Sequence, residues 1–303
     1  MIQGIPILDF HCHFPVKGDY FPDYPKSEKV NFNNKEIRDY GEIWRKAFNF
    51  PIPEESKDDI TMAKLWIEDM DKKNIEKICW VSGGGNERLS KVVSLYPDRF
   101  YGMAHHHPDS PNAAEELEKS FKEFNMKGYK LLGPNVETSL SDPKYYPLWE
   151  ICQKYNKPVL IHFGLLGASG GQPNGINISP MSIADVSKKF PKVNFVVPHF
   201  GCTYMQDLLQ LCWTRDNVWV DTSGSNQWIR WMPYKLSLED VMRKFIETVG
   251  PERIIFATDS SWMPRGFAYI YLEEQHKNLR FLGLNDSDIH KVLHLNAERL
   301  LEV

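Results

Sequence analysis

The stretch PILDFHCHFP, residues 6–15, ends an apolar run with two histidines. Its apolar residues are typical of a short buried strand, in which residues two apart point to the same side. His11 and His13 are therefore expected to share one face at the end of this strand. Two imidazoles placed in this way can bind one metal ion, although two ordinary polar residues at a strand end would give the same pattern. The choice depends on what the rest of the chain brings to the same place.

Seven further segments repeat this apolar pattern, and helix-like stretches with apolar residues three and four apart lie between them. Such an alternation builds a parallel sheet, and eight repeats predict an α/β fold that closes into a (β/α)8 or TIM barrel. The predicted strands span residues 5–11, 76–82, 99–104, 127–132, 157–163, 193–199, 217–223 and 253–259.

The first connection breaks the alternation, because residues 14–60 are rich in Pro, Tyr, Phe and Asn and have no clear period. This segment leaves strand one at its C-terminal end, where barrels of this kind place their active sites. We interpret it as an insertion or lid over the active site, with a surface loop that does not touch the substrate as the alternative. Residues 1–303 are then one barrel domain that includes the insertion.

The composition of the 303 residues is that of a globular protein, with 42% hydrophobic residues and a net charge of -4. Such a charge, with scattered lysines, argues against nucleic acid as a partner. No apolar run approaches the roughly 18 residues of a membrane span, so we expect a cytoplasmic protein with no membrane contact. The five cysteines include no C-x-x-C pair and are interpreted as reduced thiols, with Cys12 facing away from the two histidines.

Polar residues also end other predicted strands. Because the C-terminal ends of parallel strands meet at one rim of a barrel, these side chains are expected to converge on the barrel axis. Three imidazoles and a carboxylate suit a divalent transition metal that keeps an open position for water. The residues are His11 and His13 after strand one, His162 after strand five, His199 after strand six and Asp259 after strand eight.

The motifs DFHCHF, KPVLIHFG, PHFG, FATDSSW and DIHKVLHLNAERLL together resemble the amidohydrolase superfamily. The resemblance is to its amidohydrolase-2 branch, which includes aminocarboxymuconate-semialdehyde decarboxylase, and it covers the barrel but not the insertion. It implies that His11, His13, His162 and Asp259 bind one divalent metal ion, which we expect to be zinc. It also implies that His199 is an acid or base outside the ligand set. Asp259 could in addition carry the proton that a water molecule gives up.

A second histidine group follows strand three in the motif MAHHHP. His105 and His107 share one face there and His106 takes the other, so either of the first two could contact a substrate. Packed or hydrogen-bonded histidines are the alternative.

Lys130 lies on predicted strand four, where some superfamily members carry a carboxylated lysine between two metals, but we expect no second ion.

The loops after strands seven and eight carry aromatic and basic residues in the motifs NQWIRWMPY and SSWMPRGF. Arginine binds carboxylates in a bidentate way and tryptophan stacks on flat rings, so these loops predict a pocket for a small, planar, anionic substrate. Packing against the insertion or a partner subunit is the alternative, and a homodimer is left open. The residues are Arg230, Trp231, Trp262 and Arg265, with Trp228 beside them.

Two reactions fit this predicted metal site. A metal-dependent hydrolase would use an activated water molecule on a small anionic or cyclic substrate, and we prefer it as the broader class. A metal-dependent decarboxylase of an aromatic or unsaturated carboxylic acid is the first alternative, and an arginine directed at the open side of the metal would favour it. A barrel that binds a metal or ligand without catalysis is the second alternative.

Overall fold

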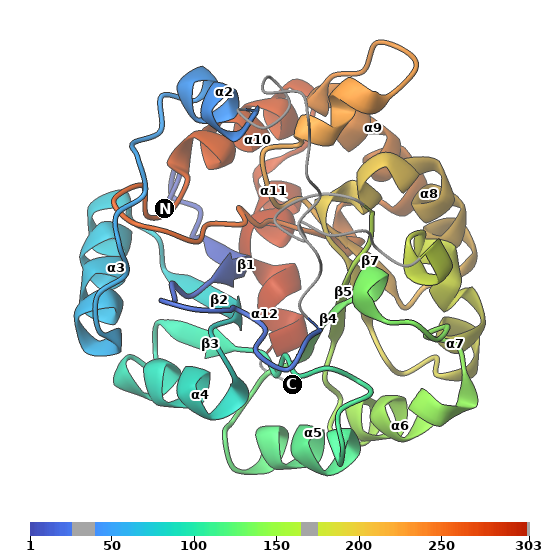
Figure 1. Cartoon of the computed structure of the whole chain (residues 1–303). Coiled ribbons are helices and arrows are strands. Elements are labelled where there is room, and N and C mark those ends of the chain that lie inside the picture. The colour runs from blue at the N-terminus through green and yellow to red at the C-terminus, as the bar shows by residue number, and fades with distance from the viewer. Residues whose placement is uncertain (26–39, 165–174, 302–303) are drawn as a thin grey trace.

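The computed structural model describes residues 1–25, 40–164 and 175–301. Within these residues, eight strands form the inner wall of a barrel and helices surround them (Figure 1). Each strand runs parallel to its paired neighbours. The strands are β1 (Leu8–His13), β2 (Lys77–Ser82), β3 (Phe100–Gly102), β4 (Tyr129–Leu132), β5 (Val159–His162), β6 (Phe195–Val197), β7 (Val218–Asp221) and β8 (Ile254–Ile255).

At least one helix follows every strand, as a parallel barrel requires. None of the helices in the described residues is long and apolar enough to cross a membrane. The helices are α2 (Tyr40–Ala47), α3 (Asp59–Lys73), α4 (Asn86–Leu95), α5 (Ala113–Lys122), α6 (Tyr146–Lys154), α7 (Ala184–Lys189), α8 (Met205–Thr214), α9 (Leu238–Val249), α10 (Tyr269–Phe281), α11 (Asp286–His290) and α12 (Asn296–Leu301).

Local sequence signals set several of these helix ends. The Asp58 side chain accepts a hydrogen bond from the backbone N–H of Thr61 and so caps the start of α3, which ends at Asn74 with a left-handed φ of 55°. Ser237 and Asp240 form a capping box at the start of α9. These caps satisfy backbone groups that have no partner inside the helix.

The barrel closes through two isolated bridges between its two runs of paired strands. Strands β1 to β3 form one run and β4 to β8 form the other. Ala104 pairs with Tyr129 at one junction, and Cys12 pairs with Ser260 at the other. The fold predicted from the repeated strand and helix pattern, a (β/α)8 barrel, is therefore confirmed.

Seven strands lie within the predicted segments and are shorter, and the first strand is shifted. The first strand covers Leu8–His13 and not residues 5–11, so both histidines lie within it. The last strand has only two residues, Ile254–Ile255, although the sequence pattern predicts a strand over residues 253–259. Asp259 has a φ of 59°, which is incompatible with a regular strand. The chain therefore leaves the sheet before this residue, and the backbone turn directs its side chain.

Apolar residues fill the barrel in two layers. One cluster lies inside the wall and includes Leu8, Phe10 and Trp219, while a larger cluster lies between the strands and the surrounding helices. Helix α12 adds Leu300 and Leu301 to the inner cluster and packs against β1 and β8. Because apolar residues fill the barrel, the polar side chains that could carry out a reaction are those at the ends of the strands.

The described part of the 14–60 segment packs against the barrel through aromatic rings. Phe48 and Phe50 lie with their ring centroids 5.4 and 5.8 Å from that of Tyr271 in α10, and the Trp44 ring is 5.5 Å from Phe50. Residues 26–39 of the predicted insertion lie outside the described residues. Its role as a lid stays a prediction.

The side chain of Asn217 makes buried hydrogen bonds that help to hold the barrel wall together. It is 8% exposed, and its Nδ2 lies 3.0, 3.2 and 2.8 Å from the carbonyl oxygens of Ser187, Phe190 and Val193. Asn217→Ala should lower the free energy of unfolding by about 2–3 kcal/mol, because buried carbonyls that lose a donor cost roughly 1–3 kcal/mol each. Urea denaturation measures the change. Asn278→Ala, within α10, is the control and should change it by less than about 0.5 kcal/mol; equal effects would contradict the prediction.

Candidate metal centre

Strand β1 delivers two histidine rings to the end of the barrel. The side chain of His11 is 1% exposed and that of His13 is 18% exposed, and their ring centroids are 5.2 Å apart. The Nδ1 atom of each ring has a polar partner: Asp221 Oδ2 lies 2.9 Å from that of His11, and Ser82 Oγ lies 2.5 Å from that of His13. The Nε2 atoms of both rings remain for a ligand.

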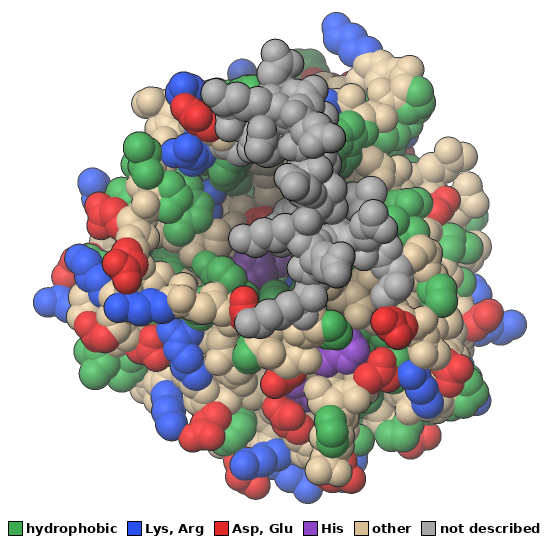
Figure 2. All heavy atoms as spheres, viewed as in Figure 1, with side chains coloured by type: hydrophobic (Ala, Val, Ile, Leu, Met, Phe, Trp, Pro, Cys, Tyr) green, Lys and Arg blue, Asp and Glu red, His purple; other side chains and the backbone are tan. Residues whose placement is uncertain are grey.

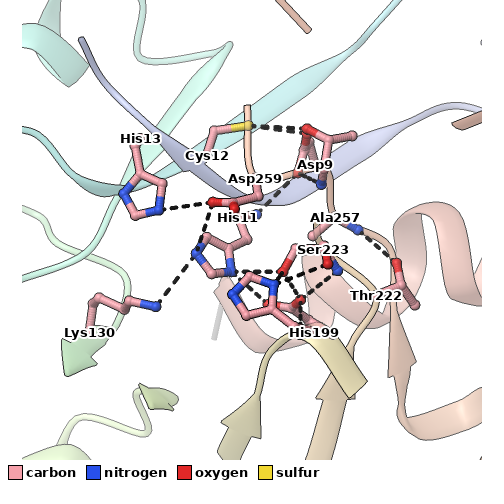
Figure 3. A network of polar contacts seen from close by, with 12 residues as sticks. Asp9, His11, Cys12, His13, Lys130, His199, Thr222, Ser223, Ala257 and Asp259 are labelled. Carbon is pink, nitrogen blue, oxygen red and sulfur yellow. Dashed lines mark hydrogen bonds and ion pairs between the residues drawn. The ribbon is translucent and has the colours of Figure 1, made fainter. Parts of the chain in front are cut away.

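Asp259 brings a carboxylate to these two nitrogens (Figure 3). Its backbone N–H donates to the carbonyl of His11 at 2.9 Å, and its Oδ1 lies 3.1 Å from His13 Nε2 and 4.0 Å from His11 Nε2. Ligands bound at about 2.0–2.2 Å around one ion lie about 3–4 Å apart, so these spacings suit a single divalent metal. In the part of the chain that the structure describes, this is the one group of three such residues with donor atoms within 4.8 Å.

The electrostatics of the group favour the forms that bind metals. Burial lowers the pKa of His11 well below its usual value, so its imidazole is neutral. Burial alone would raise the pKa of Asp259, but the hydrogen bond and charge of His13, with smaller contributions from His199 and His11, hold that pKa well below its usual range. Neutral imidazole and ionised carboxylate are the ligand forms of these side chains.

His162, at the end of β5, faces the same region but is not one of the three. Its ring centroid lies 5.1 Å from that of His199. Among the described residues its buried Nε2 has no hydrogen-bond partner, and burial lowers its pKa well below the usual value. A buried nitrogen without a partner is costly, and a bound ion would satisfy it. Ligation by His162 stays a prediction that this nitrogen supports.

His199, directly after β6, lies beside these residues. Its ring centroid is 5.3 Å from that of His11. Its φ of 56° is left-handed, and its Nδ1 lies 3.0 Å from the carbonyl oxygen of Ser223. This placement suits an acid or base next to the metal, as the sequence predicts, and its role in catalysis stays a prediction.

The described part of the insertion lies beside this group of residues. Figure 2 shows a histidine side chain inside a depression near the middle of this face. Tyr20 and Phe21, from the described part of the insertion, place their ring centroids 5.7 and 6.3 Å from that of His13. The Tyr20 hydroxyl donates to the carbonyl of Ser261 at 3.1 Å, which joins the insertion to the loop after β8. The insertion therefore contributes aromatic surface close to the candidate metal centre.

Lys130, on β4, approaches the site from below the rim. The residue is 1% exposed, and its Nζ lies 3.5 Å from His11 Nε2. Burial lowers the pKa of Lys130 to about 8. The described residues contain no second group of three His, Cys, Asp or Glu side chains with donor atoms within 4.8 Å of one another. The expectation of a single ion at this site stays a prediction.

Two polar residues that contact the histidines were missed by the sequence-based prediction. Asp221 contacts His11, and Ser223 contacts both His11 and His199. A signal was present, because the motif VWVDTS ends strand seven with polar residues at the rim where the other site residues lie. The signal was weak, because aspartate and serine are also common in loops that have no role in a site.

His105 lies under the loop that follows β2. Its Nε2 accepts hydrogen bonds from the backbone N–H groups of Gly83 and Gly85 at 3.2 and 2.9 Å, and its Nδ1 lies 3.0 Å from the carbonyl of Met103. Both ring nitrogens are therefore occupied by backbone groups. These contacts hold a loop and leave substrate binding by His105 unsupported.

His107 and His106 are held in the same manner. The Nδ1 of His107 accepts from the backbone N–H of Asp109 at 3.1 Å, and its Nε2 lies 3.2 Å from the carbonyl of Asn135. His106 is 1% exposed, and its Nε2 lies 2.9 Å from the carbonyl of Ala113. Substrate contact by His107 stays a prediction, and its present contacts are structural.

The predicted arginine and tryptophan pocket divides into two parts. Arg230 is exposed and stacks on Trp231, which is 47% exposed, with the guanidinium carbon 4.5 Å from the ring centroid. Trp228 is fully buried. The first two residues therefore lie on the surface of this structure, and substrate binding by them stays a prediction.

Arg265 lies next to Asp259 of the candidate metal centre. It is 7% exposed, and its Nη2 donates to the backbone carbonyl of Asp259 at 3.4 Å. Its guanidinium carbon lies 4.6 Å from the ring centroid of Trp262 and 5.1 Å from that of Phe50. Its Nε has no hydrogen-bond partner within residues 1–25, 40–164 and 175–301. A buried guanidinium with an unused donor is suited to an anionic ligand.

Cys12 faces away from the candidate metal centre. Its Sγ donates to Oδ2 of Asp9 at 3.1 Å on the other side of β1. Asp9 also accepts from the backbone N–H of His11 and of Thr258, both at 3.1 Å, and so fastens β1 to the chain after β8. The cysteine therefore packs and does not join the metal-binding group.

Curated relatives of the chain include two decarboxylases. A gamma-resorcylate decarboxylase from Polaromonas is 24% identical over 57% of this chain and 64% of the relative, slightly less than two thirds of its length. A 2-amino-3-carboxymuconate-6-semialdehyde decarboxylase from Dictyostelium discoideum is 32% identical over 25% of this chain and 22% of the relative.

Solved structures with the same barrel cover almost the whole chain. A 2,6-dihydroxybenzoate decarboxylase from Rhizobium is 18% identical, covers 99% of both chains and has a TM-score of 0.63. A 5-carboxyvanillate decarboxylase from Novosphingobium aromaticivorans, solved with bound manganese and a nitrobenzoic acid, is 16% identical, covers 100% of this chain and 98% of its own, and has a TM-score of 0.64. A probable 2-pyrone-4,6-dicarboxylic acid hydrolase from Acinetobacter baumannii is 14% identical over 99% and 100%, with a TM-score of 0.62.

The family itself is shown by a match along nearly the entire sequence. The model of the Amidohydro_2 family, described as amidohydrolase, matches residues 8–303. This range contains every residue of the candidate metal centre, including the histidines of β1. The resemblance predicted from the motifs is therefore confirmed, and the chain belongs to the Amidohydro_2 family of the amidohydrolase superfamily.

Proposed function

We propose that this enzyme is a metal-dependent, non-oxidative decarboxylase of an aromatic carboxylic acid. The observation that carries the proposal is Arg265, a buried guanidinium 3.4 Å from the backbone oxygen of Asp259 and in contact with aromatic rings. An arginine there can hold a substrate carboxylate beside the metal-binding side chains. The named decarboxylases among the relatives support the same choice.

The metal would be held by His11, His13, His162 and Asp259. A bound divalent cation supplies a Lewis acid that polarises and orients the oxygen atoms of the substrate. The ligand set suits zinc, our expectation from the sequence, and it suits manganese, which is bound in the related 5-carboxyvanillate decarboxylase. Metal analysis of the purified protein by mass spectrometry decides between the two ions.

His199 would carry the proton that the reaction requires. In decarboxylation, a proton adds to the ring carbon that bears the carboxylate, and the bond to that carboxylate then breaks. The electron pair of this bond returns to the ring, and carbon dioxide leaves. The Nδ1 of His199 faces the carbonyl of Ser223, which can only accept, so its Nε2 is the nitrogen that can exchange a proton with the substrate.

Hydrolysis is the second candidate, because one structurally similar barrel is named as a probable hydrolase of a cyclic diacid. In that reaction a water molecule would attack a carbonyl, and His199 would take or give the proton. The residues described above fit both reactions. Both kinds of substrate carry a carboxylate that Arg265 could bind, and the named decarboxylases among the relatives favour decarboxylation.

An isotope experiment separates the two reactions. The zinc- or manganese-loaded enzyme is incubated in D2O with 2,6-dihydroxybenzoate and 5-carboxyvanillate, the acids named for the related decarboxylases. We expect carbon dioxide and a product with one deuterium at the carbon that lost the carboxylate. A lactone panel in H2 18O tests the other reaction. Incorporation of 18O from the solvent without release of carbon dioxide would refute the proposal.

Arg265→Ala tests the carboxylate contact. A buried hydrogen-bonded ion pair contributes roughly 1.5–3 kcal/mol, so KM for the acid should rise by about 10–100-fold. Inhibition by the decarboxylated product should change far less, because that molecule lacks the carboxylate. Arg243→Ala, in a surface ion pair with Glu239 on α9, is the control and should leave KM unchanged. If Arg265→Ala behaved like Arg243→Ala, Arg265 would be structural.

A further inference from the structure

The end of β7 places a buried carboxylate behind the candidate metal centre. Asp221 is the last residue of this strand and is 0% exposed. Its Oδ2 lies 2.9 Å from Nδ1 of His11. Its Oδ1 accepts hydrogen bonds from the Ser223 backbone N–H, at 2.8 Å, and from the Ser223 hydroxyl. Asp221 thus contacts a metal-binding histidine directly and is itself held by Ser223.

Ser223 extends this network to the second histidine (Figure 3). Its Oγ lies 2.8 Å from Nδ1 of His199 and 3.2 Å from Nδ1 of His11. Its carbonyl oxygen lies 3.0 Å from the same nitrogen of His199. The proposed metal ligand and the proposed proton carrier therefore share one pair of polar neighbours on the Nδ1 side of both rings.

The partners determine whether the Nδ1 atom of each ring carries a hydrogen. A carbonyl oxygen can only accept, so Nδ1 of His199 carries a hydrogen. The Ser223 hydroxyl has one hydrogen, which goes to the carboxylate of Asp221 because that group accepts and cannot donate. The serine oxygen then accepts from the histidines, and no hydrogen is left over or missing in the network.

The same reasoning applies to His11 and has an independent check. Its Nδ1 must donate to the carboxylate of Asp221, so its Nε2 has a free electron pair. On the far side of the ring, the Lys130 ammonium lies 3.5 Å from that Nε2. An ammonium group only donates, so both sides of the ring indicate the same tautomer.

We infer that Asp221 and Ser223 are a positioning pair that holds His11 and His199 with their protons on Nδ1 and presents both Nε2 atoms to the site. The pair acts through the histidines and contacts neither the metal nor the substrate. The inference rests on the proposed roles of the two histidines and is independent of whether the reaction is decarboxylation or hydrolysis.

Asp221→Asn should disturb the hydrogen bonds to His11 and Ser223 with little change in side-chain volume. The amide offers one oxygen and one NH2 group where the carboxylate has two acceptors. With its NH2 toward His11, two donors face each other, so the ring must move its proton to Nε2 and lose the electron pair that binds metal. Loss of such a partner typically weakens metal binding by about 10–100-fold, and we expect this size of effect on the dissociation constant for Zn2+.

Ser223→Ala should have a smaller and different effect. It removes the hydroxyl but keeps the carbonyl that holds His199 and the carboxylate that holds His11. Affinity for Zn2+ should stay close to that of the wild type, while kcat should fall by about 2–10-fold, the equivalent of one hydrogen bond. The neighbouring Thr222→Val is the matched control, because the Thr222 hydroxyl bonds to Gln275 and to the backbone of Ala257 and not to the histidines.

The decisive measurement is the tautomer of each ring, read from 15N NMR of full-length, metal-free protein with labelled histidines. Signals are assigned by their loss in His11→Ala and His199→Ala. We expect Nδ1–H on both rings in the wild type and in Thr222→Val, and a shift to Nε2–H on His11 in Asp221→Asn. Competition with a chelator then gives the dissociation constant for Zn2+ of each variant.

Two results would overturn the inference. One is a wild-type spectrum with the proton on Nε2 of His11 or His199, which needs no variant to fold. The other is a folded Asp221→Asn variant that keeps both the wild-type tautomer and the wild-type affinity for Zn2+. Neither readout uses a substrate, so absence of carbon dioxide release would refute the proposed reaction and leave this test intact.

Discussion

Replacing His11 with alanine is expected to remove the metal and the activity together. The His11 ring is buried, its Nδ1 is fixed by Asp221, and its Nε2 lies 4.0 Å from Oδ1 of Asp259 across the proposed ion position. Even loss of a partner that only orients a ligand weakens metal binding by about 10–100-fold, so loss of the ligand itself should exceed about 100-fold. Metal stoichiometry after dialysis, measured beside turnover, checks both effects.

Cys12→Ser is the matched control for this strand. The residue is adjacent to His11 but points to Asp9 on the other side of β1, and serine retains a donor for that carboxylate. Metal content should equal that of the wild type. A His11→Ala enzyme that kept a full equivalent of metal would contradict the proposed site.

Replacing His199 with alanine should lower turnover while the metal stays bound. The ring lies 5.3 Å from that of His11 and 5.1 Å from that of His162, and the proposed ligand set does not include it. Loss of a positioned acid or base costs about 10²–10⁴-fold in rate, and we expect kcat to fall by that amount. Metal analysis and steady-state kinetics are measured on the same preparation.

His199→Asn separates proton transfer from packing. The asparagine amide nitrogen is attached at Cγ, as Nδ1 of histidine is, so it can still donate to the carbonyl of Ser223. It cannot take up and release a proton, so this variant should be nearly as slow as the alanine variant. If His199→Ala lost its metal as completely as His11→Ala, His199 would be a direct ligand. If it retained full activity, the histidine would be structural.

The barrel and the centre of the site follow from sequence patterns because their cause is local. A strand alternates its side chains with a period of two, and parallel strands end at one rim. These two rules suffice to place His11, His13 and Asp259 together, as the structure has them. The exact strand ends were less predictable, since the turn at Asp259 depends on its contact with the backbone of His11.

The role of an individual histidine is not a local property. His105 and His11 both follow apolar strand residues, yet Nε2 of His105 accepts from two backbone N–H groups, while Nε2 of His11 belongs to the candidate metal centre with His13 and Asp259. The partners of His105 come from the loop after a neighbouring strand. The sequence around a histidine does not indicate which of its ring nitrogens already has a hydrogen-bond partner.

The sequence by itself determined the (β/α)8 barrel, the family and the rim on which the candidate metal ligands lie. The reason is that the local pattern of apolar and polar residues indicates the period of each strand and the order of the strands along the chain. Only the tertiary structure decided that Arg265 is buried beside Asp259 while Arg230 is exposed, and that Asp221 lies behind His11. The physical reason is that burial and hydrogen bonding depend on side chains from strands and loops far apart in the chain, which meet only when the barrel closes.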